Sequence, residues 1–358
     1  MTLHSTPCFM VQEKSKKSPE TILITRFSAV GDIAMTIPLL YSLADAYPEK
    51  RFVFVSRERF GQFLVNAPKN LLFEGVDLNK YKGLGGLYNL KKRLMAHKPD
   101  AIADLHNVLR TKILRLYLKL SGVKCAAQDK GRAEKKRLTR HKNKDTRQLK
   151  STFERYREVF VKLGLEFTPN FVSLFGDGKG DLSTLQLPQK GGEQWIGVAP
   201  FARHGGKIYP VERLEKVIAG LAATPGLRIF CFGNGKEEQA IVDKWCARYK
   251  NVESFIGKSD FCGELTLISN LELMVSMDSA NMHIASLVNT PVVSIWGATS
   301  PLAGFLGWRQ QVSDCVQLPL ECRPCSIFGN KPCIYGDYRC MHIEPQVIVD
   351  RILKKLGR

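Results

Sequence analysis

Short apolar runs alternate with amphipathic segments along most of the first half of the chain. The apolar and β-branched runs lie at 21–25, 51–56, 71–76 and 101–105. Segments with the apolar spacing of helices separate them, at 33–46, 84–96 and 109–120. This alternation predicts the strands of a parallel sheet joined by helices. Because segment 109–120 is apolar around much of its circumference, we expect that helix to be largely buried.

The second half repeats this plan. Strands are predicted at 195–199, 227–232, 252–255, 271–275 and 291–296, and helices at 211–222 and 236–248. A last helix should begin at Pro345 and dock through Val347, Ile348, Ile352 and Leu356. The pattern therefore predicts an α/β protein with two doubly wound, Rossmann-like domains that face a central cleft.

A stretch rich in Pro and Gly, with little periodicity, lies between the two halves at 165–193 and predicts an interdomain linker. Residues 1–19 carry several Lys and precede the first strand, so we expect a frayed tail there. The predicted divisions are a tail at 1–19, an N-terminal domain at 20–180, a C-terminal domain at 181–344 and a final helix at 345–358.

The stretch 277–283 lies between two predicted strands and begins a short helix. Asp278 and Ser279 offer capping side chains, and the free N–H groups and dipole of a helix N-terminus favour a phosphate. The small-residue turn 297–301 follows the next strand, so both loops should face one crevice at the carboxyl edge of the sheet. The competing interpretation is that Asp278 and Ser279 only cap the helix and His283 packs inside it.

The first strand is followed by a small-residue loop that ends in Gly31 and Asp32. This loop should also lie at a carboxyl sheet edge, facing the cleft. Asp32 is a candidate functional carboxylate, although the same residue could simply cap the helix that follows. Closure of two such domains would bring Asp32 and Asp278 toward one another.

The formal net charge of +19 favours a polyanionic partner, either nucleic acid, anionic lipid or a phosphorylated substrate. Between 124 and 150 there are eleven Lys or Arg against three Asp or Glu, with no aromatic residue to stack a base. This favours phosphate and carboxylate groups over bases. The alternative is a solvated charged loop. No run is long enough to span a bilayer and no signal peptide is evident, so we expect a cytoplasmic chain.

Ten cysteines without a signal peptide indicate thiols in a reducing compartment. Four of them form one cluster, Cys322, Cys325, Cys333 and Cys340. Their first spacing is typical of structural zinc and the other two are looser, so zinc and packed thiols both stay open, and packed thiols are favoured. The chain has no Asp-x-Asp pair to hold a diphosphate through a metal, and we expect no metal at the active site.

With these positions established, the sequence resembles glycosyltransferase family 9, the ADP-heptose:lipopolysaccharide heptosyltransferases, over roughly residues 20–355. The matching motifs are the stretch 28–32 with Thr36 and Pro38, Lys207 before Tyr209 and Pro210, the turn 233–238, the stretch 278–280 with His283, the stretch 291–301 and the Cys-rich segment. The resemblance implies a GT-B architecture, with the acceptor on the N-terminal domain and the nucleotide-sugar on the C-terminal one.

The resemblance also implies roles for individual residues. Asp32 matches the catalytic base, and Lys207 matches the lysine that meets the donor phosphates. The pyrophosphate pocket matches Asp278, Ser279, Ala280 and His283, and Glu237 lies near the family's ribose-contacting glutamate. No cofactor is implied, since the ADP-sugar is a substrate. Asp278-Ser279-Ala280 departs from the more frequent Asp-Thr-Gly, and Tyr209 stands where tryptophan is usual.

The predicted function is inverting transfer of a heptose or related sugar from an ADP-sugar to an anionic, lipid-linked lipopolysaccharide core acceptor, at the cytoplasmic face of the inner membrane. Lys135, Lys136, Arg137 and Arg140 are the candidate acceptor-binding residues. One alternative is a nucleic-acid-binding protein that uses the basic segment, but neither aromatic platforms nor a helix-turn-helix pattern is present. The other is a nucleotide-dependent oxidoreductase, but the first strand is not followed by Gly-x-Gly-x-x-Gly.

Overall fold

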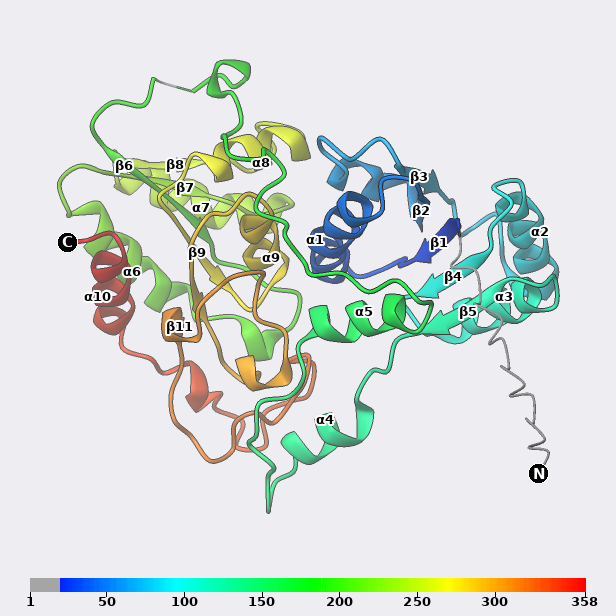
Figure 1. Ribbon diagram of the computed structural model, residues 1–358. Helices are drawn as coiled ribbons and strands as arrows, with labels where there is room; N and C mark the ends of the chain where they lie inside the picture. Colours follow the sequence, from blue (N-terminus) through cyan, green and yellow to red (C-terminus); the bar gives the residue numbers. More distant parts are fainter. Residues whose placement is uncertain (1–19, 188) are drawn as a thin grey trace, which may run out of the picture.

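The computed structural model describes residues 20–187 and 189–358, which form two α/β units lying side by side (Figure 1). The predicted tail at 1–19 lies outside the described residues. Each unit is a parallel sheet covered by helices, as the alternating sequence pattern predicts.

The N-terminal sheet has five parallel strands in the order β3-β2-β1-β4-β5. Its strands are β1 (Thr21–Thr25), β2 (Arg51–Ser56), β3 (Leu71–Gly75), β4 (Ala101–Asp104) and β5 (Lys124–Ala127). Strands β1 and β2 are buried along nearly their whole length, because helices cover both faces of the sheet. The strand order turns back between β1 and β4, so their carboxyl ends border a crevice.

The helices of this domain are α1 (Val30–Ala46), η1 (Glu58–Phe63), α2 (Gly83–Met95), α3 (Leu109–Lys119), α4 (Arg132–Leu138) and α5 (Thr152–Val161). Helix α1 is buried along most of its length, because α5 covers it from its own domain and α9 from the other.

The C-terminal sheet has six parallel strands in the order β11-β10-β9-β6-β7-β8. Its strands are β6 (Gln194–Ala199), β7 (Leu227–Cys231), β8 (Val252–Ser254), β9 (Leu273–Met277), β10 (Val292–Ile295) and β11 (Cys315–Val316). Counted within the domain, this is the doubly wound order 3-2-1-4-5-6, and it turns back between β6 and β9. Both predicted Rossmann-like sheets are thus present.

The helices of the second domain are α6 (Val211–Ala222), α7 (Lys236–Arg248), α8 (Phe261–Ser269), α9 (Ala280–Leu287) and α10 (Pro345–Lys355), with the short helices η2 (Leu182–Thr184), η3 (Gly205–Lys207), η4 (Pro301–Ala303), η5 (Val312–Asp314) and η6 (Arg339–Met341). Helix α10 packs on α6. Its buried face is Ile348, Val349 and Ile352, whereas Val347 is exposed, so the docking face predicted for this helix was wrong at Val347.

The basic stretch from 124 to 150 is more ordered than a solvated loop. It contains β5 at the sheet edge and α4, which begins after Gly131 with φ of +59°. Leu138 at the end of α4 is buried against Leu149 and Ala303, the last of which belongs to the other domain. The charge pattern concealed this helix because its packing rests on a single buried leucine.

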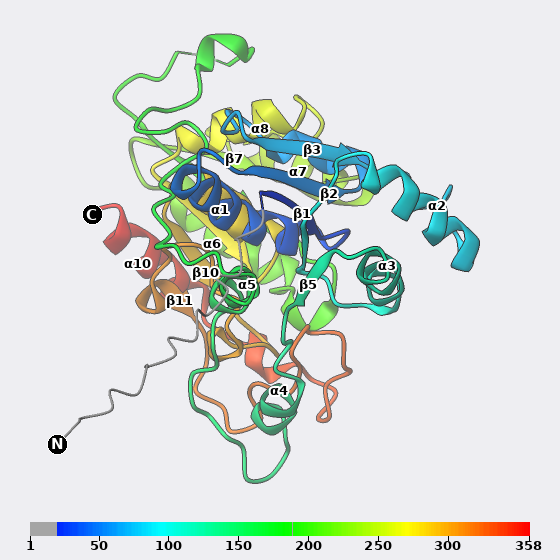
Figure 2. The same ribbon diagram turned by 45° about the vertical axis from the view of Figure 1, so that its right-hand side comes forward.

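The burial predicted for the 109–120 helix was wrong. Leu114 and Leu118 of α3 are buried under the sheet, but Leu109, Leu116 and Leu120 point away from it and are 75%, 54% and 78% exposed. The α2–α3 pair lies on the side of the N-terminal domain away from the second domain (Figures 1 and 2). Nothing in the described chain covers these leucines.

Candidate active site

Asp32 lies in the first turn of α1, just beyond the carboxyl end of β1. Its Oδ2 accepts a hydrogen bond from the backbone N–H of Ala29 at 3.0 Å and pairs with a guanidinium nitrogen of Arg26 at 2.5 Å. The capping interpretation therefore describes part of what this carboxylate does. Its side chain keeps 26% of its surface exposed, so one face is open to a second partner.

Arg26 was not predicted as a site residue. It follows β1 directly and is buried, and one of its guanidinium nitrogens donates to the carbonyl oxygen of Leu105 at 2.7 Å. The guanidinium also lies 5.8 Å from the centre of the Tyr156 ring. A charge held this firmly keeps the Asp32 carboxylate in one orientation. Only the juxtaposition of β1 with β4 brings Leu105 within reach, which a reading along the chain does not reveal.

His106 follows β4 on the other side of this turning point in the sheet. Its Nε2 lies 3.3 Å from Ser28 Oγ, and its Nδ1 is buried without a hydrogen-bond partner among the described residues. Burial, with Arg26 and Lys130 nearby, lowers the pKa of His106 to about 3, although Asp32 opposes the shift. The imidazole is therefore neutral at physiological pH and beside the candidate base.

On the C-terminal domain, Lys207 and Asp278 lie in the segments that follow β6 and β9, the two strands between which the strand order turns back. Lys207 ends η3, after β6, and its Nζ lies 2.8 Å from Oδ2 of Asp278, which follows β9. Asp278 is buried, so its negative charge holds the ammonium group in place. This pairing brings together two residues that the sequence selected independently.

The predicted side-chain capping of α9 was wrong. Ser279 occupies the N-cap position, but its hydroxyl lies 3.2 Å from Ser276 Oγ and makes no bond to the first turn. Asp278 is engaged with Lys207 instead. The first-turn N–H groups of α9, starting at Ala280, therefore receive no side-chain cap, which suits an anion at this helix terminus.

His283 lies one turn further along α9 and is buried, and its Nδ1 has no hydrogen-bond partner in the part of the chain that the structure describes. Burial lowers its pKa to about 4, with Asp278 and Asp32 opposing the shift and Lys207 adding to it. His283 is thus neutral and lies within electrostatic range of charged groups from both domains.

Gly31 lies where the two predicted site regions come into contact. A Cβ added to Gly31 would lie 2.9 Å from Cδ2 of His283 and 3.7 Å from Cα of Ala280. Helices α1 and α9 pack together at this point. Only glycine leaves room for the imidazole, so the loop bearing Asp32 lies directly against the helix start that bears Ala280 and His283.

Close backbone contacts support Lys207 from behind. The N–H of Ala298 donates to the carbonyl of Gly206 at 2.8 Å, and a Cβ at Gly297 would lie 2.7 Å from that same oxygen. Gly329 has φ of +71°, and a Cβ there would lie 2.6 Å from Cγ of Lys207. The Cys-rich segment thus forms one wall of the slot that holds the lysine stem.

Glu237 lies in the first turn of α7 with its side chain exposed, and its role as a donor contact stays a prediction. The neighbouring Glu238 is the residue that folds back on the turn, where its Oε2 accepts from the N–H of Asn234 at 2.6 Å. Glu238 was not selected from the sequence. Its distinguishing signal is the four-residue spacing that lets a first-turn carboxylate reach the preceding loop.

The four predicted acceptor-binding cations do not form a single group. Lys135 is half-buried with its Nζ 4.5 Å from the centre of the Phe305 ring, within electrostatic range of Asp32. Burial, followed by Arg155, lowers the pKa of Lys135 to about 8. Lys136, Arg137 and Arg140 are exposed.

The segment that follows α4 contacts the other domain repeatedly. Lys144 Nζ donates to the carbonyl oxygens of Cys322 and Pro324, at 2.5 and 3.2 Å. The backbone N–H of Leu149 donates to the carbonyl oxygen of Leu302, and that of Thr152 donates to the carbonyl oxygen of Gly304, each at 2.9 Å. These bonds tie the basic segment to the loops beside Lys207.

The thiols of Cys322, Cys325, Cys333 and Cys340 are free. Burial raises the pKa of Cys340 to about 11, which keeps this thiol protonated. Across 20–187 and 189–358, no three or more His, Cys, Asp or Glu are grouped so that they could hold a metal ion. The main structural contribution of this segment is through its backbone, since the N–H groups of Cys325 and Ser326 both donate to the carbonyl of Ala298.

Two cavities lie outside the pairs described above. One of about 230 Å³ is bordered by Arg57, Asp77, Asn79 and Arg110 near the carboxyl ends of β2 and β3. It places two guanidinium groups, which were not predicted as site residues, at this edge of the N-terminal sheet.

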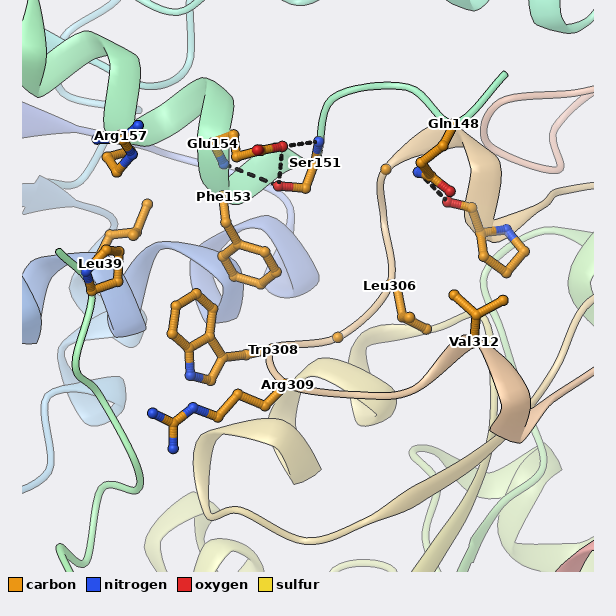
Figure 3. A pocket seen from close by; sticks show the side chains of 14 residues that line it. Leu39, Gln148, Ser151, Phe153, Glu154, Arg157, Leu306, Trp308, Arg309 and Val312 are labelled. Carbon is orange, nitrogen blue, oxygen red and sulfur yellow. Dashed lines mark hydrogen bonds between the residues drawn. The ribbon is translucent and has the colours of Figure 1, made fainter. Parts of the chain in front are cut away.

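The other cavity, of about 610 Å³, lies between α5 and the loop 301–312 (Figure 3). Phe153 and Trp308 pack edge to face in its lining with ring centres 4.9 Å apart, and Arg157 and Arg309 lie toward one side in this view. Trp308 also donates from Nε1 to the carbonyl of Phe171 at 3.1 Å. None of the predicted site residues lines this cavity, so we regard it as part of the seam between the domains.

Within the described part of the chain, no helix is both long enough and apolar enough to cross a membrane.

Comparison with known proteins gives one consistent result. The model of "Glycosyltransferase family 9 (heptosyltransferase)" matches residues 87–335. A lipopolysaccharide core heptosyltransferase OpsX from Haemophilus influenzae is 25% identical, covering 80% of this chain and 81% of that protein. Lipopolysaccharide heptosyltransferase 1 from Escherichia coli K12 is 24% identical, and the match covers 81% of this chain and 92% of that protein. The solved structure of the E. coli heptosyltransferase WaaC with ADP has the same fold, with a TM-score of 0.65, 18% identity, and 94% and 99% coverage.

Proposed function

Because the chain belongs to glycosyltransferase family 9, the heptosyltransferases, we propose that it transfers a heptose, or a closely related sugar, from an ADP-sugar to a lipopolysaccharide core acceptor. The observation that carries this proposal is the contact between Gly31 and His283. This contact places Asp32, at the edge of the N-terminal sheet, in the same site as the N-terminus of α9 and the Lys207–Asp278 pair, at the edge of the C-terminal sheet.

In this proposal the acceptor hydroxyl lies beside Asp32. As its oxygen forms a bond to the anomeric carbon, the proton passes to Asp32, and the bond between that carbon and the diphosphate oxygen breaks. ADP leaves with the bonding electrons from the opposite face, so a single displacement inverts the anomeric centre. Arg26 holds the carboxylate in a fixed orientation toward the hydroxyl.

The leaving diphosphate is assigned to the C-terminal domain. Lys207 offsets the negative charge that develops on the phosphate oxygens, and the free first-turn N–H groups of α9 add donors to it. His283, neutral because it is buried, can donate a hydrogen bond without introducing a second full charge. This scheme uses only the protein's own groups for charge compensation, and the ADP-sugar enters as a substrate.

The acceptor is proposed to be an anionic, lipid-linked saccharide bound on the N-terminal domain. Lys135 lies within electrostatic range of Asp32, and the exposed Lys136, Arg137 and Arg140 add further positive charge on the same helix or just beyond it. Such a substrate requires the enzyme to work at the cytoplasmic face of the inner membrane as a peripheral protein. Charge complementarity supports this assignment.

The test is an assay of the purified chain against a panel of nucleotide-sugars with lipopolysaccharide core acceptors. We expect ADP release that depends on the acceptor and is selective for an ADP-linked heptose. Release from none of the panel, or release that is equal without acceptor, would contradict transfer. Tight RNA binding without any binding of ADP-sugar would favour the nucleic-acid alternative.

A further inference from the structure

Helices α2 and α3 carry apolar side chains on both of their sides. Their inner sides place Leu87, Leu90, Leu94, Leu114 and Leu118 in the core. The outer side has five exposed residues, Leu84, Tyr88, Leu109, Leu116 and Leu120, which we call the outer face. Leu84 and Tyr88 are one turn apart on α2, and Leu109, Leu116 and Leu120 follow one stripe of α3.

The outer face is one surface because the two helices pack against each other. The rings of Tyr88 and Tyr117 meet edge to face, with centres 5.7 Å apart. Both helices lie on the side of the N-terminal domain away from the second domain (Figures 1 and 2). A folded chain rarely leaves so many large apolar side chains together in water unless they meet a partner.

The charge of these helices is of one sign. Neither α2 nor α3 contains Asp or Glu, and together they carry seven cations, Lys91, Lys92, Arg93, Arg110, Lys112, Arg115 and Lys119. Arg93 pairs with Glu74, and Arg115 with Asp104. The other five make no ion pair with the described residues, and Lys91 and Lys92 lie over the Tyr88 ring.

We propose that the outer face docks on an anionic lipid bilayer, with the leucines and Tyr88 entering the headgroup region and the five unpaired cations contacting lipid phosphates. Apolar stripes flanked by Lys and Arg are the pattern of helices that lie in the membrane interface. A second copy of this chain is a poorer occupant, because a two-fold contact would bring two sets of unpaired cations together. This inference identifies the membrane-binding surface for the proposed function and rests on it.

The position of the outer face suits a lipid-linked substrate. Helix α3 begins at Leu109, a few residues beyond His106, and Arg110 borders the small cavity that also contains Arg57. The apolar surface therefore starts at the rim of the acceptor side of the crevice. A saccharide attached to a lipid in the bilayer would enter the crevice from this rim.

The experiment is sedimentation of the full chain with vesicles of phosphatidylcholine containing one quarter phosphatidylglycerol, at low and high salt. The apolar variant replaces Leu109, Leu116 and Leu120 with Gln, and the charge variant replaces Lys91, Lys92, Lys112 and Lys119 with Gln. A matched control replaces the exposed Val312, Phe328 and Val347 with Gln.

We expect the apolar variant to lose at least about tenfold in vesicle partitioning at both salt concentrations, because the contact it removes is not screened. The charge variant should lose as much at low salt and differ little from wild type at high salt, because salt already screens that attraction in wild type. The control should bind like wild type. Since the altered side chains are exposed, all three should melt at the wild-type temperature.

Wild-type partitioning by the apolar variant, or failure of wild type to bind these vesicles, would overturn the proposal. A concentration-dependent dimer that the apolar substitutions abolish, without change in vesicle binding, would assign the outer face to a second copy. Transfer to a delipidated acceptor separates this inference from the proposed function. The apolar variant should keep that activity, and its absence in wild type would contradict the function instead.

Discussion

The two domains each place an aspartate beside a cation at the point where the strand order turns back, but the two pairs differ in construction. Asp32 and Arg26 come from one strand-loop-helix unit, and Asp32 keeps 26% of its side chain exposed. Asp278 and Lys207 come from two units, and it is Asp278 that is buried, whereas Lys207 is the more accessible partner at 17%. The first pair therefore offers a carboxylate to the crevice, and the second offers an ammonium group.

This difference shows how one fold unit serves two chemical tasks. A buried cation that orients an accessible carboxylate suits proton transfer, because the carboxylate can meet a hydroxyl. A buried carboxylate that orients an accessible cation suits a diphosphate. In each pair, the less accessible residue holds the more accessible one in place. Substitution of Asp32 should therefore affect turnover, and substitution of Lys207 should affect ADP binding.

The largest effect is expected for Asp32→Asn, which keeps the size and the bond to Ala29 but removes the base. Turnover should fall by about 100-fold or more, in line with the loss of a general base. ADP affinity, measured by calorimetry, should stay unchanged because Lys207 is untouched. Near-normal turnover would show that Asp32 has only its capping role.

Lys207→Ala tests the Lys207–Asp278 pair of the C-terminal domain. ADP affinity should weaken by roughly 10- to 100-fold, since a hydrogen bond to a charged group contributes about 1.5–3 kcal/mol. His283→Ala should weaken ADP binding less, because the neutral imidazole carries no full charge. Calorimetry with ADP measures both, and wild-type affinity in both variants would place the diphosphate elsewhere.

Gly31→Ala tests whether the two sites must touch. The added methyl lies 2.9 Å from the buried His283 ring, and overpacking of this kind costs about 1–3 kcal/mol. We expect a melting temperature lower by several degrees and a fall in turnover of roughly tenfold. Gly191→Ala is the control, because no atom of the described residues lies within 4 Å of the added carbon there. The double variant with His283→Ala should recover stability, and failure to do so would mean that the contact is not the cause.

The smallest effect is expected for the basic segment. Replacing Lys135, Lys136, Arg137 and Arg140 with Gln should raise the acceptor KM severalfold and change ADP affinity by less than about twofold, or roughly 0.4 kcal/mol. The difference should fade as salt increases. An unchanged acceptor KM at low salt would remove these residues from the acceptor site.

A pH titration separates Lys135 from its three neighbours. With its pKa lowered to about 8, Lys135 is charged below that pH and neutral above it. Its contribution to acceptor binding should therefore disappear between about pH 7 and 9, and Lys135→Arg should flatten this part of the profile. An identical profile for wild type and the Arg variant would assign the pH dependence to another group.

The fold class and the strands other than β5 and β11 could be predicted, because buried parallel strands are continuous apolar runs and their alternation with helices allows few arrangements. Lys207 was selected from one motif, and Asp278 and His283 from another, and the structure brings them together. Their roles, and that of Asp32, remain predictions.

Other features could not be predicted because they depend on neighbours far away in the sequence. Arg26 is defined by Leu105 and Tyr156, and His106 by Ser28. The exposure of Leu116 and Leu120 could not be predicted from the sequence. An apolar helix surface indicates that the surface is covered, but it does not indicate whether the same chain or another molecule covers it. Helix α4 was hidden for the opposite reason, since its surface is almost entirely charged.

The hydrogen bonds from Lys144, Leu149 and Thr152 to the opposite domain have a consequence for how the two substrates influence each other's binding. These bonds join the segment after α4 to loops of the C-terminal domain, so binding at the proposed acceptor site should alter the affinity of the proposed donor site. Thermodynamic linkage requires the factor to be the same in both directions. Acceptor affinity measured with and without saturating ADP gives this factor, and the reverse measurement must reproduce it. A factor above one predicts that each bound substrate tightens the binding of the other, whereas a factor of one predicts that the two substrates bind independently.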